Sequence, residues 1–163
     1  MVNHHQRVVA IAAALAAMVA ATPSPIAEAI RFSKETVSKC QEKWQVSEEI
    51  IEEMQRNKGA LPNEDSVEQR CFAECVAKEM GVINNGGGVA VDKIVKILEA
   101  VFEMASKETG EKLKLDSRAL KRDLEACEFK GEDDECTNSY DTLKCLRTLG
   151  TSENMRLYVT KES

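Results

Sequence analysis

Six cysteines carry the most reactive side chains in this chain of 163 residues. Their spacing is C-x30-C-x3-C-x51-C-x8-C-x8-C, formed by Cys40, Cys71, Cys75, Cys127, Cys136 and Cys145. Thiols in such a set either ligate a metal or oxidise to disulfides. Structural zinc sites favour C-x2-C pairs, which this spacing lacks, so the cysteines favour a disulfide framework.

The positions of the two histidines limit the chemistry that the chain can perform. The chain has two, His4 and His5, and both precede an apolar run from Val8 to Ala21. Without them the chain has no imidazole, which excludes Ser-His and Cys-His nucleophile pairs and histidine-ligated zinc. We therefore expect a protein that is not an enzyme and that uses no cofactor and no metal.

The N-terminal segment has the order of a secretory signal peptide. Arg7 precedes the apolar run, and Ala27-Glu28-Ala29 after it forms an A-x-A cleavage site. The run is short for a membrane span, so an uncleaved anchor is the less favoured alternative. We predict that residues 1–29 are a signal peptide and that residues 30–163 form one secreted, extracellular domain, where oxidising conditions allow disulfides.

Charge and hydropathy narrow the choice of partners. The formal net charge is -6, which gives the protein no electrostatic reason to bind nucleic acid. No later segment approaches ~20 continuous apolar residues, so no stable membrane insertion is expected.

Apolar residues recur at helical spacing through most of the chain. The clearest pattern runs from Val91 to Ala105, where apolar side chains follow i, i+3, i+4 and i+7. Glycines predict helix ends at Gly110 and Gly150. Capping residues predict the other helix starts, namely Ser33, Ser47, the Asp65-x-x-Glu68 capping box, Asp116, and Asp133 or Asp134. The sequence predicts an all-α fold of about six helices.

Three segments between or after these helices need a separate interpretation. Asn84-Asn85-Gly86-Gly87-Gly88 has neither a strand before it nor a GK[ST] after it, so it predicts a turn and not a phosphate-binding loop. The acidic run from Glu132 to Glu135 lacks calcium-ligand spacing and suits the first turn of the last helix. Met155, Leu157 and Val159 stand at period two, which predicts an extended tail with one apolar side.

Helix geometry limits which cysteines can pair. Cys71 and Cys75 lie on one helix face with parallel side chains, which disfavours a bond between them. Cys136 and Cys145 stand ~13.5 Å apart along one helix, beyond the reach of a disulfide. Excluding these two pairs leaves ten of the fifteen connectivities that six cysteines allow.

The cysteine spacing, the predicted signal and the helical pattern together resemble the insect odorant-binding proteins, the six-cysteine type of the pheromone/general odorant-binding protein family. The x3 and the final x8 are the most specific parts of this resemblance, which covers nearly all of residues 30–163. The local sequence agrees in Arg70-Cys71-Phe72-Ala73-Glu74-Cys75 and in Cys136-x3-Tyr140-x4-Cys145. The chain departs from the family in a longer gap between Cys75 and Cys127, and we expect the excess between Gly86 and Leu115.

The resemblance implies the pairs Cys40–Cys75, Cys71–Cys136 and Cys127–Cys145. It also implies a compact helical bundle, with these three disulfides, around an internal apolar cavity for a small hydrophobic ligand, an odorant or a pheromone. A chemosensory receptor is the implied destination, and the oligomeric state is left open. The candidate ligand-binding residues are apolar or aromatic side chains of the predicted helices and tail: Ile50, Met54, Phe72, Val76, Met80, Ile94, Leu98, Val101, Phe102, Leu124, Tyr140, Leu143, Leu157 and Tyr158.

The sequence therefore leaves two functions open. One is a carrier of small hydrophobic molecules, in which the tail folds back to cover or wall the cavity. The other is a secreted, disulfide-linked interaction protein whose packed core leaves only its surface to bind another macromolecule. Helical periodicity does not separate these two, because a filled and a hollow bundle bury the same helix faces.

Overall fold

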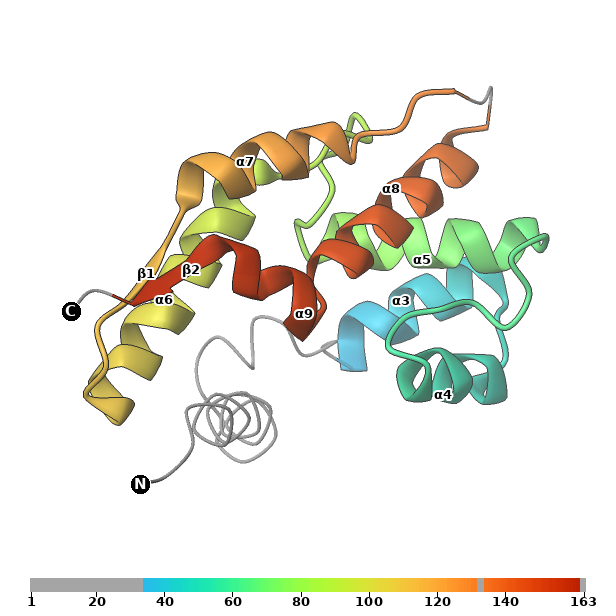
Figure 1. The fold of residues 1–163 in the computed structure, drawn as a ribbon. Helices are drawn as coiled ribbons and strands as arrows, with labels where there is room; N and C mark the ends of the chain where they lie inside the picture. The colour runs from blue at the N-terminus through green and yellow to red at the C-terminus, as the bar shows by residue number, and fades with distance from the viewer. Residues whose placement is uncertain (1–33, 132–133, 162–163) are drawn as a thin grey trace.

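The computed structural model describes residues 34–131 and 134–161, so the predicted signal peptide and the Ser33 cap lie outside the described residues. The described part is mostly helical, which confirms the all-α prediction (Figure 1). Its helices are α3 (Lys34–Trp44), α4 (Glu48–Arg56), α5 (Val67–Glu79), α6 (Val91–Thr109), α7 (Ser117–Ala126), α8 (Glu135–Leu149), the short α9 (Ser152–Met155) and the 3-10 helix η1 (Arg156–Tyr158). Two short strands, β1 (Leu113–Leu115) and β2 (Val159–Lys161), pair in an antiparallel sheet.

Capping side chains begin the helices largely where the sequence predicts. Ser47 accepts a hydrogen bond from the Ile50 amide, and Asp116 accepts one from the Ala119 amide at 3.0 Å. Asp134 caps α8 by accepting the Thr137 amide at 2.9 Å, so Asp134 is the cap among the two candidate aspartates.

The predicted cap of α5 is wrong by one residue. Ser66, and not Asp65, accepts the Gln69 amide, at 3.2 Å. Asp65 belongs to the preceding turn, where its amide donates to the Asn63 side chain at 3.1 Å. The capping box was misplaced because serine and aspartate stand side by side and either can fill the first position.

The tail also differs from the prediction. Thr151 caps α9, so the chain from Met155 to Tyr158 is helical, and only β2 is extended. The apolar face is consequently made by Met155, Tyr158 and Val159, whereas Leu157 is 76% exposed. In a turn of helix, side chains on the same face recur about every third residue and not every second one. A search for the alternation of a strand does not detect such a face.

Two apolar clusters form the interior. Cluster 1 joins α3, α4, α5 and α8 and includes the buried Met54, Phe72 and Tyr140. Cluster 2 joins α6, α7, the β-sheet and η1 and includes the buried Phe102 and Tyr158. In Figure 1, α8 lies over α5, and the chain continues through α9 into β2 beside α6 and α7. Helix α8 therefore contributes to both clusters.

Three disulfides connect these elements. Cys40–Cys75 joins α3 to α5, Cys71–Cys136 joins α5 to α8, and Cys127–Cys145 joins the end of α7 to α8. These are the three pairs that the resemblance implies. The bonds close loops of 35, 65 and 18 residues. Each is expected to stabilise the fold by about 3–4 kcal/mol, because it lowers the conformational entropy of the unfolded chain.

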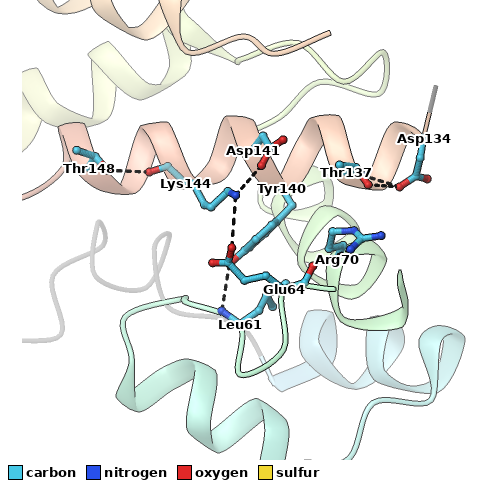
Figure 2. A network of polar contacts seen from close by, with 9 residues as sticks. All are labelled: Leu61, Glu64, Arg70, Asp134, Thr137, Tyr140, Asp141, Lys144 and Thr148. Atoms are coloured by element: carbon cyan, nitrogen blue, oxygen red, sulfur yellow. Dashed lines mark hydrogen bonds and ion pairs between the residues drawn. The ribbon is translucent and has the colours of Figure 1, made fainter. Parts of the chain in front are cut away.

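Tyr140 fixes the α4–α5 loop to α8, as Figure 2 shows. Its hydroxyl accepts a hydrogen bond from the Leu61 amide at 3.2 Å and donates one to Glu64 Oε1 at 2.9 Å. Lys144 Nζ lies 3.5 Å from the other oxygen of Glu64 and 2.7 Å from Asp141. Because Tyr140 is only 1% exposed, its hydroxyl satisfies a buried amide that water does not reach.

We predict that Tyr140→Phe lowers the free energy of unfolding by about 1–3 kcal/mol, because it leaves the buried Leu61 amide without a partner. Urea denaturation followed by circular dichroism measures the change. Tyr158→Phe is the matched control, since the Tyr158 hydroxyl bonds a single carboxylate that solvent can reach. A Tyr140→Phe loss no larger than that of the control would contradict this role.

Candidate functional site

Both clusters have half-buried apolar side chains packed against them, and α8 contributes to both. Leu143 packs against cluster 1, whereas Leu146, one turn further along the same helix, packs against cluster 2. Met80 adds a half-buried side chain to cluster 1, and Ile94 and Leu98 of α6 add two to cluster 2. We call these five residues the cluster junction. Apolar side chains that the protein leaves partly uncovered are what an apolar ligand can bury.

Helix α6 supplies such side chains because it is apolar over more of its surface than its neighbours cover. Its buried residues are Val95, Phe102 and Ala105, and it packs against α7 and β1. Ile94, Leu98 and Val101 are spaced i, i+4 and i+7, so they lie on one face of the helix with the buried Ala105, and these three are half-buried. Ile94 and Leu98 pack against cluster 2 and still keep part of their surface uncovered.

The structure divides the predicted ligand-binding residues between the two clusters. Those of cluster 1 are Ile50, Met54, Phe72, Val76, Met80, Tyr140 and Leu143. Those of cluster 2 are Ile94, Leu98, Phe102, Leu124 and Tyr158. Val101 and Leu157 belong to neither cluster. Helix α8 contributes Tyr140 and Leu143 to the first group, and the candidates that lie deepest, such as Phe72 at 1% exposure, serve the packing of their own cluster.

Sequence reasoning missed Leu146, Leu149 and Met155, which are half-buried against cluster 2. A signal for the first two was present, because Leu143, Leu146 and Leu149 recur every third residue along one side of a helix. The period-two pattern places Met155 on the apolar side of the tail, but Met155 is not among the predicted ligand-binding residues.

Both tyrosine hydroxyls are bonded within the protein. Tyr140 bonds Leu61 and Glu64, as described above, and the Tyr158 hydroxyl donates to Asp123 Oδ2 at 2.7 Å. The bond from Arg122, at 2.9 Å, and then the bond from Tyr158 hold the pKa of Asp123 below its usual value. Burial, followed by the bond to Asp123, raises the pKa of Tyr158. Tyr158 thus attaches the tail to α7.

A groove of about 520 Å³ lies on the surface between α6 and β1. Phe102 is the one predicted ligand-binding residue that lines it. The other residues that line it are Glu99, Glu103, Ser106, Lys112, Leu113, Lys114, Leu115 and Ser117. It is open to solvent, and we call it the α6–β1 groove.

Within residues 34–131 and 134–161, no three histidine, cysteine, aspartate or glutamate side chains converge in a way that could hold a metal ion. Over the same residues, none of the helices combines the length and the apolarity that crossing a bilayer requires.

Comparison with known proteins agrees with the fold and the disulfides. A sequence model of the PBP/GOBP family matches residues 27–148, and the chain belongs to this family. The resemblance seen in the cysteine spacing is thereby confirmed. The match ends within α8, so α9, η1 and β2 lie beyond it.

Among solved structures, the chain is similar to a medfly odorant-binding protein, with 20% sequence identity and a TM-score of 0.46. The alignment covers 76% of this chain and 91% of the medfly chain. No curated protein matches the sequence.

The bond between Tyr158 and Asp123 predicts how the tail responds to acid. A carboxylate whose pKa is lowered in the folded protein stabilises it above the unfolded pKa of about 3.9, and this contribution is lost as the pH falls through the folded pKa. We therefore expect the amide NMR shifts of Val159 and Thr160 to stay constant from pH 7 to about pH 4 and to change below it. Asp123→Asn should remove this acid transition, and a transition centred near pH 6 would contradict the assignment to Asp123.

Proposed function

We propose that this member of the PBP/GOBP family is a secreted carrier that binds a small hydrophobic molecule at the cluster junction. The observation that carries the proposal is that Met80 and Leu143 of cluster 1 and Ile94, Leu98 and Leu146 of cluster 2 are left half-buried. In this proposal residues 1–29 are removed as a signal peptide, and the ligand completes the interior. A carrier of this kind performs no catalysis.

The expected affinity follows from the area that a ligand would bury. About 300 Å² of apolar surface offers roughly 7 kcal/mol of transfer free energy, from which the losses of association are subtracted. Because about 7 kcal/mol corresponds to a Kd of about 10 μM, binding in the micromolar range is the tightest that this area alone would give. Because the tyrosine hydroxyls are already bonded, the site selects for shape and apolarity more than for one functional group.

Odorants and pheromones are small, largely apolar molecules, so they have the chemistry that such a site accepts. Delivery to a chemosensory receptor is the corresponding role in the organism, and it rests on family membership. Binding at the cluster junction can be tested without knowing the receptor.

A second candidate function is favoured by two exposed side chains. Leu157, which lies in η1, is 76% exposed, and Phe129, which follows α7, is 43% exposed. Exposed apolar side chains suit contact with another macromolecule. A secreted interaction protein with a filled core would use them and would bind no small apolar probe.

The decisive measurement is the binding of N-phenyl-1-naphthylamine to the delipidated protein, followed by its fluorescence. We predict that Leu98→Trp weakens binding about tenfold or more, because a larger side chain occupies the space that the probe would fill. Ile97→Trp is the matched control, since Ile97 is also half-buried on α6 but packs against neither cluster.

Equal effects of the two variants would place the probe elsewhere. Absence of probe binding to the unmodified protein would favour the interaction protein instead. Circular dichroism of each variant checks that the helices are retained.

The tail gives an independent prediction. Met155, Tyr158 and Val159 pack against cluster 2, so we propose that the tail walls one side of the ligand site. Deletion of residues 152–163 should therefore weaken probe binding several-fold while the helix content stays nearly constant. Unchanged affinity in the truncated protein would show that the tail takes no part in binding.

A further inference from the structure

We propose that the α6–β1 groove is a second ligand site, which takes an amphiphile with a short apolar chain and an anionic head, such as a medium-chain carboxylate. The groove is separate from the cluster junction. Its walls come from α6 and from the segment of residues 112–117. The inference does not depend on binding at the junction.

Hydrogen bonds close the groove at both ends. At one end, the Ser106 hydroxyl accepts a hydrogen bond from the Leu113 amide at 3.0 Å. At the other end, the Ser117 hydroxyl donates to Glu99 Oε1 at 2.5 Å. Glu99 and Ser106 stand seven residues apart on α6, which sets a length of about 10 Å between the two ends. The volume of about 520 Å³ lies within the range of about 300–1,000 Å³ that small-molecule sites occupy.

The surface inside the groove is largely apolar. The apolar side chains that line it are the buried Phe102 and Leu115 and the half-buried Leu113. Lys112 and Lys114 also line it, and the aliphatic stem of Lys112 can cover an apolar chain while its ammonium group stays in water. A chain lying on Phe102 would thus be covered on two sides.

Charge distinguishes one end of the groove from the other. The Lys112 ammonium has no ion-pair partner within the described part of the chain. Glu103 on the α6 side is already paired with Lys107 at 2.8 Å, and that bond lowers the pKa of Glu103. Glu99, at the far end, keeps its carboxylate beside Ser117. An anionic head is therefore attracted toward Lys112 and repelled by Glu99, which fixes one orientation of the ligand.

The experiment is a titration of ¹⁵N-labelled protein with sodium octanoate, followed by amide chemical shifts, with octanol as the uncharged comparison. We expect octanoate to shift the amides of Phe102, Leu113 and Leu115. Lys112→Gln should weaken octanoate binding about fivefold, as expected for the loss of a partly exposed ion pair, and should leave octanol binding unchanged. Lys58→Gln, which alters an exposed lysine of the α4–α5 loop, is the matched control and should have no effect.

Two outcomes would overturn the proposal. One is that octanoate shifts the amides of the cluster junction but not those of the groove. The other is that Lys112→Gln and Lys58→Gln have the same effect on octanoate binding. Failure of the carrier function is seen separately, since a protein that does not bind the naphthylamine probe can still bind octanoate in a Lys112-dependent manner.

Discussion

The covalent attachment of α8 is the constraint on which the rest of the structure depends. Cys136 binds its first turn to α5, and Cys145 binds its middle to the end of α7. The helix that belongs to both clusters is thus fixed to both of them by bonds that survive thermal motion. Because disulfides stabilise a fold largely by restricting the unfolded chain, the interior need not be packed completely.

Hydrogen bonds of two buried tyrosines also join segments that are distant in the sequence. In each cluster a buried tyrosine donates to a carboxylate from another element: Tyr140 to Glu64 in cluster 1 and Tyr158 to Asp123 in cluster 2. The first bond holds the α4–α5 loop, and the second holds the tail. In each cluster, therefore, the hydrogen bonds of one tyrosine hydroxyl hold one irregular segment against the helices. The helices supply most of the side chains of each cluster. The two segments determine how completely the apolar side chains of their cluster are covered.

Local physics made much of the fold predictable from the sequence. Helix starts at Ser47, Asp116 and Asp134 follow from a side chain that bonds an amide three residues away, so they need no knowledge of distant parts of the chain. The cysteine pairing came from family resemblance, because geometry alone left ten connectivities open. Long-range contacts were not predictable. The pairing of β1 with β2, and the division of the apolar residues into two clusters, depend on which distant segments meet, and three-residue strands carry too little pattern to reveal their partner.

The tail lies beyond the part of the chain that the family model matches. The matched residues end at 148, whereas Met155, Tyr158 and Val159, which cover cluster 2, come afterwards. All six cysteines lie before that point, so the cross-linked frame is complete without the last residues. The C-terminal segment can accordingly be treated as an exchangeable cassette: new sequences grafted after Gly150 would re-shape one wall of the protein while oxidative folding proceeds on an unchanged scaffold.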